Sequence, residues 1–474
     1  MPLIVMGVSG SGKSTIAEGV AAATGAVLLD ADDFHPESSI AKMAAGTPLT
    51  DADRGAWLAA VGDEVARRSA RGEYVVLACS ALRREHRDIL RAHAEDLVFA
   101  HLVGTPELLA ERLGARAGHF MPASLLISQL ATLDPLAADE HGVVVNVAQH
   151  PRAVVEEVLA GWPRRSSHTP VSRDDVAPEL QALARRAPHI RLENRLMRAI
   201  FVHGSKLVPS FDVDGVDRRV VRERNVNLRL YQPSGQRSTA GGLFWIHGGG
   251  LVLGAAKMDD RFCGETAARL GITVVSVEYR ASTTRGYPIA LDDLDAAWHW
   301  MHTHADQLRI DTQRIAVGGQ SAGGGLAAAF TQKLFDRGDQ VAAQWLFCPM
   351  IDDRTAADRS LDAAGHLIWN NRANLVGWTS YLGKQYEKAT QPYAVASRRE
   401  DLSGLPPAWV YASDIELFVD EDIAYARRLR AAGVDVVLDI VQGAPHGFES
   451  WAADTELAKR LSGRARDWLG RTLS

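Results

Sequence analysis

The stretch Leu3–Ser14, with the sequence LIVMGVSGSGKS, is the most informative part of the first 162 residues. Its apolar start is typical of a buried strand, and the residues that follow fit the pattern G-x-x-x-x-G-K-[ST]. The glycines let the backbone curl so that several N–H groups point at phosphate oxygens, and the next helix presents its positive N-terminus there. Residues 3–14 therefore predict a phosphate-binding loop between a strand and a helix.

The loop and the start of the helix hold the candidate contacts to a nucleoside triphosphate. Lys13 is expected to reach the β- and γ-phosphates, and the Ser14 hydroxyl is expected to ligate Mg²⁺. The candidate nucleotide-binding residues here are Gly7, Ser9, Gly10, Ser11, Gly12, Lys13, Ser14 and Thr15. A glycine turn without a nucleotide is the alternative, and the flanking strand and helix patterns disfavour it.

A second polar turn, DADDFHP, follows the apolar run 26–29, which predicts the next strand. Ligands bind at the carboxyl edge of parallel sheets, so Asp30 and Asp32 could face a nucleotide bound at the end of the first strand. One carboxylate could orient or deprotonate an acceptor hydroxyl, and another could support Mg²⁺. A solvated acidic loop is the alternative for this segment.

Residues 1–162 closely resemble the gluconate kinase family. The similar segments are LLDADDFHP (28–36), KMAAGTPLTDADRGAWL (42–58), ACSALRREHRD (78–88), ARAGHFM (115–121) and SQLATLDP (128–135). The resemblance implies a compact P-loop kinase with a parallel sheet, which uses ATP and Mg²⁺ to phosphorylate the 6-hydroxyl of D-gluconate. A different small-molecule P-loop kinase is the alternative, because a phosphate site does not identify the acceptor.

The resemblance also implies roles for individual side chains. Asp32 would be the base for the acceptor hydroxyl, with Asp30 in support, and His35 and Arg54 would contact the sugar acid. A guanidinium suits bidentate binding of the gluconate carboxylate, and the candidates for that contact are Arg83, Arg84 and Arg87. A run of arginines on a helix is also a common solvated face, so the choice among them stays open.

Further contacts come from later segments of the same region. A lid-like segment carries Arg116 and His119, and an arginine there could stabilise the transferred phosphoryl group and exclude water. Arg112 is expected to bind the nucleotide together with Arg116. Gln129 is a further candidate for the substrate pocket, with an ordinary place on a helix surface as the alternative.

The composition changes near residue 163. Residues 163–170 are polar, contain two prolines and show no periodicity, so we expect a linker over 163–175 between domains at 1–162 and 176–474. Acidic residues outnumber basic ones in residues 1–162, whereas the remainder is nearly balanced. The expected strands of the second domain are 243–246, 273–277, 315–317, 344–347, 408–412 and 436–440, again alternating with helices.

The second domain contains a possible nucleophile in Gly319–Gly323, which fits G-x-S-x-G around Ser321. The segment HGGG at 247–250 follows a predicted strand, and the N–H groups of Gly248, Gly249 and Ala322 could stabilise an oxyanion. His446, after the last predicted strand, could activate Ser321 and protonate the leaving group. The order serine, acid, histidine is that of α/β-hydrolases.

Residues 175–474 resemble the hormone-sensitive-lipase-like esterases. That family has its acid four residues before an Asp-Glu pair, which puts Glu416 in the triad, with Asp414 as the second candidate and Asp420 as a loop stabiliser. The family's Y-R-x-A-P-E motif lacks its Pro-Glu here. The resemblance implies an α/β-hydrolase domain with a helical cap from residues 176–210 and 354–390. Trp369 and Trp378 line the pocket or belong to the core.

Several classes of function are disfavoured. The net charge of −6 gives no reason to expect nucleic-acid binding, and no apolar run is long enough to span a membrane. No secretion signal is evident, and the three dispersed cysteines, Cys79, Cys263 and Cys348, suggest the reducing cytoplasm. The histidine cluster His299, His302 and His304 has no convincing metal-ligand spacing.

We therefore expect a bifunctional chain that phosphorylates D-gluconate with ATP and hydrolyses an ester or lactone through an acyl-serine. The fusion motivates the hypothesis that the hydrolase releases the kinase's substrate from a gluconate ester or a sugar lactone. A different kind of function is the alternative, in which only one domain is an enzyme and the other is a non-catalytic regulatory module. The sequence leaves the ester substrate and any homo-oligomer open.

Overall fold

The computed structural model describes the chain apart from a set of short segments. These are 25, 45–49, 72, 95–96, 115–122, 138, 163–165, 187–191, 193–197, 201–203, 205–206, 224–225, 283–285 and 384–389. The chain divides into two compact units, Met1–Arg164 and Arg165–Ser474.

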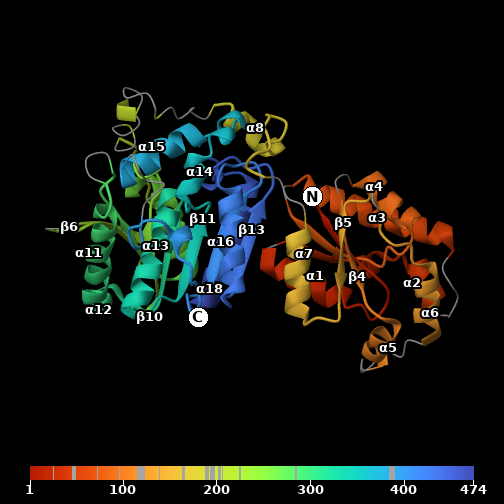
Figure 1. Cartoon of the computed structure of the whole chain (residues 1–474). Helices are drawn as coiled ribbons and strands as arrows, with labels where there is room; N and C mark the ends of the chain where they lie inside the picture. Colours follow the sequence, from red (N-terminus) through yellow and green to blue (C-terminus); the bar gives the residue numbers. More distant parts are fainter. Residues whose placement is uncertain are drawn as a thin grey trace. The chain divides into compact units, whose positions relative to one another are not determined.

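The first unit contains a five-stranded sheet with the strand order β2-β3-β1-β4-β5, and every pair of neighbours is parallel (Figure 1). Its strands are β1 (Leu3–Met6), β2 (Val27–Asp30), β3 (Val75–Ala78), β4 (Val98–Val103) and β5 (Gly142–Asn146). Its helices are α1 (Lys13–Thr24), α2 (Glu37–Ala44), α3 (Asp51–Ser69), α4 (Arg84–His93), α5 (Pro106–Gly114), α6 (Ala123–Thr132) and α7 (Pro151–Gly161), with the 3₁₀ turn η1 (Ala31–Phe34).

The central position of β1 determines where this unit can bind a ligand. All four of its residues are fully buried, because helices cover both faces of a parallel sheet. Helix α1 packs against α7, and α3 packs against α4 (Figure 1). The turns after β1, β2 and β3 therefore meet at one edge of the sheet, where the phosphate loop, the acidic turn and residues 79–80 come together.

The second unit has an eight-stranded sheet in the order β13-β12-β11-β10-β8-β9-β7-β6. Its strands are β6 (Val216–Glu223), β7 (Val226–Pro233), β8 (Ala240–Ile246), β9 (Thr273–Val277), β10 (Ile310–Gln320), β11 (Ala343–Phe347), β12 (Ala408–Ser413) and β13 (Val436–Val441). Strands β8 to β13 are parallel to one another, whereas β7 is antiparallel to both of its neighbours, β9 and β6.

Helices cover both faces of this sheet, since every residue of β11 and of β12 is buried. The helices are α8 (Pro178–Ala184), α10 (Asp260–Leu270), α11 (Ile289–Thr303), α12 (Ala305–Leu308), α13 (Ala322–Arg337), α14 (Asp353–Ala357), α15 (Asn371–Leu382), α16 (Val419–Ala431), α17 (Phe448–Trp451) and α18 (Glu456–Thr472). Figure 1 shows α13 and α16 along the sheet, and α10 packs against α18. Within the described part of the chain, no helix is both long and apolar enough to cross a membrane.

The segment expected as a linker contacts the second unit over much of its described length. Asp420 accepts hydrogen bonds from Ser166 Oγ (2.7 Å), Ser167 N (3.0 Å) and Ser167 Oγ (2.7 Å). Val171 N donates to Ala364 O at 2.7 Å. The compact second unit accordingly begins at Arg165, before the start at residue 176 expected from the sequence.

Candidate active sites

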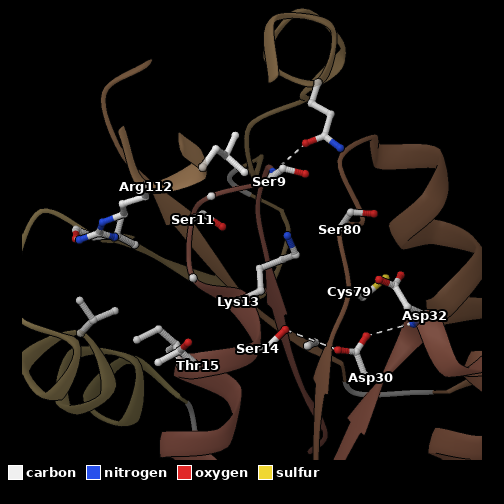
Figure 2. A pocket seen from close by; sticks show the side chains of 18 of the residues that line it. Ser9, Ser11, Lys13, Ser14, Thr15, Asp30, Asp32, Cys79, Ser80 and Arg112 are labelled. Atoms are coloured by element: carbon white, nitrogen blue, oxygen red, sulfur yellow. Dashed lines mark hydrogen bonds between the residues drawn. The ribbon is translucent and has the colours of Figure 1, made fainter. Parts of the chain in front are cut away.

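The first unit has a cavity of about 720 Å³ at the carboxyl edge of its sheet. Figure 2 shows the phosphate loop on one side of this cavity and the acidic turn after β2 on the other. The predicted residues that line it are Ser9, Gly10, Ser11, Gly12, Lys13, Ser14, Thr15, Asp30, Asp32, His35, Arg112 and Gln129. These residues, chosen from the sequence alone, therefore lie around a single cavity.

The phosphate loop has the backbone that its glycines permit. Gly7, Gly10 and Gly12 have φ angles of +149°, +84° and +85°, a region that other residues rarely adopt. A Cβ on Gly10 would also lie 2.7 Å from Leu109 O. Lys13 Nζ donates to Val8 O at 3.2 Å, so the ammonium lies beside the loop backbone. The loop can therefore present N–H groups and one cation to phosphate oxygens.

The two carboxylates of the acidic turn have different surroundings. Ser14 Oγ donates to Asp30 Oδ2 at 3.5 Å, and Asp32 N donates to Asp30 Oδ1 at 3.0 Å, as the dashed lines in Figure 2 show. The Asp32 side chain is 85% exposed and faces the cavity. Asp30 is thus held next to the Ser14 hydroxyl, whereas the Asp32 carboxylate is open to an incoming molecule.

Neighbouring side chains complete this cavity. The His35 ring stacks on Trp57 with ring centroids 4.2 Å apart, and its side chain is mostly buried at the cavity wall. Gln129 Oε1 accepts a hydrogen bond from Ser9 N at 2.7 Å, which connects α6 to the phosphate loop. Arg112 Nη2 donates to Val147 O at 2.8 Å. Arg54 is half-buried and is not among the lining residues.

The expected carboxylate-binding role of Arg87 is wrong in this structure. Its guanidinium is fully buried and forms a bidentate ion pair with Glu140, with both N–O distances at 2.7 Å. Its Nη1 also donates to the carbonyl oxygens of Ala81 and Leu82. Arg87 therefore supports the fold by joining α4 to the segment before β5. The sequence around Arg87 is polar and helical, and it gives no sign that Glu140 is buried against the guanidinium.

Arg84 does not line the cavity either. It lies on the surface and donates to both carboxylate oxygens of Asp139, at 2.9 and 2.6 Å. Arg83 pairs with Glu85 at 2.8 Å. Arg116 and His119 lie outside the described residues.

Several residues of the cavity wall were not among the predicted site residues. Ser80 lies two residues after the end of β3, and its place after a buried strand was the available signal. Cys79 lines the same wall, where burial raises the pKa of its thiol to about 12 and keeps it protonated. Gln149, Pro151 and Val154 come from the start of α7 and the turn before it. These three follow β5, which was not among the predicted strands.

The second unit has a strained turn between β10 and α13. Ser321 is at this turn with φ +54° and ψ −122°, and a non-glycine residue adopts such a backbone only when the surrounding structure enforces it. A Cβ on Gly319 would lie 2.4 Å from Gly323 O, and a Cβ on Gly323 would lie 2.1 Å from Ile246 O. The two glycines thus allow the sharp strand-to-helix turn that exposes the serine hydroxyl.

Three predicted side chains form a hydrogen-bonded chain at this turn. Ser321 Oγ and His446 Nε2 lie 2.8 Å apart, and His446 Nδ1 and Glu416 Oε2 lie 2.6 Å apart. All three residues are at least nine-tenths buried. Asp414 points elsewhere, since its Oδ1 accepts a hydrogen bond from Gly443 N at 2.7 Å. The structure therefore brings Glu416, and not Asp414, to the histidine.

The HGGG segment lies beside this serine. Gly249 has φ +128°, and a Cβ there would lie 1.8 Å from Leu253 O, so only glycine fits. Tyr279 Oη donates to His247 O at 3.0 Å, and the two rings stack 4.4 Å apart. Gly248, Gly249 and Ser321 line one cavity of about 470 Å³. Ala322, immediately after the serine, is the first residue of α13.

This cavity has a largely apolar wall. Its apolar lining side chains include Leu183, Leu253, Met258, Ile368, Trp369 and Trp451. Leu183 comes from the first expected cap segment, and Ile368 and Trp369 come from the second, so both segments contribute to the wall. Trp378 does not line the cavity, and its ring packs near Tyr381 at 6.3 Å.

Buried acids surround the Glu416–His446–Ser321 chain. Burial raises the pKa of Glu449, three residues after His446, to about 7. Burial and nearby Glu416 raise the pKa of Asp422 well above its usual range. Glu421 is also buried, and its Oε1 accepts from Ile351 N at 2.7 Å. Burial thus favours the uncharged form of these carboxyl groups beside the triad.

The clustered histidines of α11 have local partners. His302 Nδ1 lies 3.0 Å from Trp298 O, and His304 Nδ1 lies 2.8 Å from Trp300 O. Each contact spans one helical turn. Among the residues that the structure describes, no group of three metal-ligating side chains is found.

Comparison with known proteins places each unit in a family. A family model described as an AAA domain matches residues 3–136, and one described as an α/β-hydrolase fold matches residues 243–450. A gluconokinase of Gluconobacter oxydans is 46% identical over 157 residues, which cover 33% of this chain and 88% of that protein. The first unit belongs to the gluconokinase family.

The second unit is similar to esterases. Esterase LipI of Mycobacterium tuberculosis is 31% identical over 247 residues, which cover 50% of this chain and 76% of that protein. A solved structure described as a bacterial heroin esterase is 33% identical with a TM-score of 0.59, covering 64% of this chain and all of that one. The chain thus joins a gluconokinase-family unit to an esterase-family unit of the α/β-hydrolase fold.

The buried ion pair of the gluconokinase-family unit yields a stability prediction. We expect Glu140→Gln to destabilise this unit by about 3 kcal/mol at neutral pH, because Arg87 then lacks its counter-charge. The Arg87 hydrogen bond lowers the pKa of Glu140 from 4.5 to about 2, so the stabilisation is present above pH 4.5 and is lost as the pH falls towards 2. Calorimetry of the full chain, following the transition that ATP shifts, should show a weaker acid dependence in the variant.

Asp139→Asn is the matched control, since Asp139 pairs with Arg84 on the surface. It should leave the stability essentially unchanged, because exposed ion pairs contribute little. Equal effects of the two variants would contradict a structural role for the buried pair.

Proposed function

We propose that this chain is a bifunctional enzyme. The gluconokinase-family unit transfers the γ-phosphoryl group of ATP to the 6-hydroxyl of D-gluconate, giving ADP and 6-phosphogluconate. The esterase-family unit hydrolyses carboxylic esters through an acyl-serine. The observation that carries this proposal is that each unit gathers a full set of reactive groups at one edge of its own sheet.

In the kinase reaction, the gluconate hydroxyl loses its proton to Asp32 and its oxygen attacks the γ-phosphorus. The exposed Asp32 carboxylate at the cavity wall supports this role. Lys13 and the loop N–H groups stabilise the charge that develops on the phosphate oxygens. His35 and Gln129 contribute polar groups to the same cavity and are our candidates for contacts to the sugar acid.

The residues near Ser14 suit a magnesium ion. Mg²⁺ prefers oxygen ligands, and Ser14 Oγ and Asp30 Oδ2 already lie 3.5 Å apart at the cavity. We propose that these two residues hold it, Ser14 directly and Asp30 in support. When bound with ATP, the ion would neutralise charge on the β- and γ-phosphates.

In the hydrolase reaction, Ser321 Oγ attacks the ester carbonyl and gives its proton to His446 Nε2. The oxyanion accepts hydrogen bonds from the N–H groups of Gly248, Gly249 and Ala322. His446 then protonates the departing alcohol, which leaves an acyl-serine. Water attacks that acyl group with His446 as base, and the acid product is released. Glu416 orients the imidazole through its hydrogen bond with His446 Nδ1.

Both sites are proposed to work in a reducing compartment. The three cysteines are buried free thiols, which supports a cytoplasmic location.

A pair of substitutions tests whether the two activities are independent. Lys13→Ala should lower gluconate phosphorylation at least about 100-fold and leave ester hydrolysis unchanged. Ser321→Ala should lower ester hydrolysis more than about 10⁴-fold and leave phosphorylation unchanged. A coupled assay of ADP release measures phosphorylation, with gluconate as the acceptor and shikimate as the comparison acceptor. Cleavage of a p-nitrophenyl ester measures hydrolysis. A variant that loses both activities would contradict independent sites, and a wild type inactive in one assay would favour a non-catalytic module.

The identity of the triad acid is tested separately. Glu416→Ala should reduce kcat for ester hydrolysis about 10³- to 10⁴-fold, because the imidazole loses the group that orients it. Asp414→Ala should change kcat less than threefold, since its carboxylate contacts the Gly443 backbone and not His446. Steady-state kinetics distinguish the two variants when both are compared at the same concentration of folded protein. The reverse ranking would make Asp414 the acid.

The apolar cavity wall predicts the preferred ester. Each buried methylene contributes about 0.8 kcal/mol, so p-nitrophenyl butyrate should exceed the acetate about tenfold in kcat/KM. Fully polar gluconolactone should be a poor substrate for the same reason. An acyl-gluconate has an apolar acyl chain that suits the cavity wall, and its hydrolysis would release gluconate for the kinase unit. Cleavage of gluconolactone in preference to aryl and gluconate esters would contradict this.

A further inference from the structure

Gln320 occupies the variable position before the nucleophile, where β10 ends and the strained turn begins. Its Nε2 donates to Glu449 Oε1 at 2.5 Å and to Ser450 Oγ at 2.7 Å. Both partners are in α17, immediately after the loop that carries His446. One side chain on the nucleophile turn therefore holds the segment of the catalytic histidine.

The same amide lies next to the oxyanion loop. A Cβ on Gly248 would lie 3.3 Å from Gln320 Oε1, and a Cβ on Gly447 would lie 3.5 Å from Gln320 Nε2. Gln320, Gly248 and Gly447 also line the same cavity. The side chain of Gln320 is thus packed between the oxyanion loop and the histidine loop.

Glu449 is an unusual partner for this amide. It is 4% exposed, and its Oε2 is buried without a hydrogen-bond partner among the described residues. Burying a carboxyl group costs free energy unless the group is hydrogen-bonded. The hydrogen bond from Gln320 offsets part of that cost for Glu449. Glu449 Oε1 can accept the hydrogen bond from Gln320 whether the carboxyl group is ionised or protonated. The contact therefore does not depend on the charge of Glu449.

We propose that Gln320 and Glu449 are positioning residues that keep the serine turn, the histidine loop and the oxyanion loop in register. The inference rests on the proposed esterase function and deepens it. Ser321 Oγ must stay about 2.8 Å from His446 Nε2, and displacements of about 1 Å can cost 100-fold in rate. The Gln320–Glu449 hydrogen bond fixes the two backbones that set this distance.

Reversal of the pair tests the proposal. Glu449→Ala should lower kcat for a p-nitrophenyl ester about tenfold with KM within twofold, whereas Glu449→Gln, which keeps an acceptor oxygen, should stay within threefold of wild type. Gln320→Glu removes the amide donor and adds a second acid next to the buried Glu449, and should lower kcat more than tenfold. The double variant Gln320→Glu/Glu449→Gln restores a donor and an acceptor, and should recover kcat to within threefold of wild type.

Several controls separate positioning from loss of fold. Gluconate phosphorylation in the same full-length chain gives an internal measure of the concentration of chain with a folded gluconokinase-family unit. Glu456→Ala removes an exposed glutamate that pairs only with Lys459 among the described contacts of its side chain, and should leave kcat unchanged. The rate at which a fluorophosphonate labels Ser321 should follow kcat across the series.

The outcomes are distinct. A reversed pair no more active than Gln320→Glu, or a Glu449→Ala enzyme within twofold of wild type in kcat, would overturn the positioning role. If Glu449→Ala does not fold, the size-conserving reversed pair decides alone. A wild type that neither labels with the fluorophosphonate nor hydrolyses any ester would refute the proposed esterase function itself, which is distinguishable from an active wild type with insensitive variants.

Discussion

A tight turn from a parallel strand into a helix is the constraint on which both units depend. Such a turn brings backbones so close that a side chain on Gly319 or Gly323 would overlap a carbonyl oxygen in the esterase-family unit. Gly10 has the same restriction in the gluconokinase-family unit. In return, the turn exposes backbone N–H groups at the carboxyl edge of the sheet, where phosphate or an oxyanion can accept them.

The two sites use acidic groups in different ways. In the gluconokinase-family unit, Asp32 is open to solvent and free to meet a substrate, while the acid Glu140 is consumed by a buried ion pair with Arg87. In the esterase-family unit, Glu416 and Glu449 are both buried, and each is bound by a side chain of the catalytic region. Burial thus separates the acid that is open to solvent from the acids whose carboxyl groups are held by other side chains.

The motifs found in the sequence predicted most of both sites. Residues 7–15 and the chain from Ser321 through Glu416 to His446 needed only spacing, order and the resemblance to two families. The strands at 3–6 and 273–277 have the predicted limits. Strands β6 and β7 were not predicted. Strand β6 is rich in charged residues and lies at the sheet edge, where burial imposes no clear pattern.

The two α/β folds, the presence of two units and the candidate reactive side chains could be predicted from the sequence, because glycine turns and nucleophile motifs are local properties of the chain. The partners of individual polar side chains became visible only in the tertiary structure. It assigned Arg87 to Glu140, Asp414 to the Gly443 backbone, and Gln320 to Glu449, partners that lie 29 to 129 positions apart. The physical reason is that hydrogen bonds between such distant residues depend on how the elements pack, which no local pattern encodes.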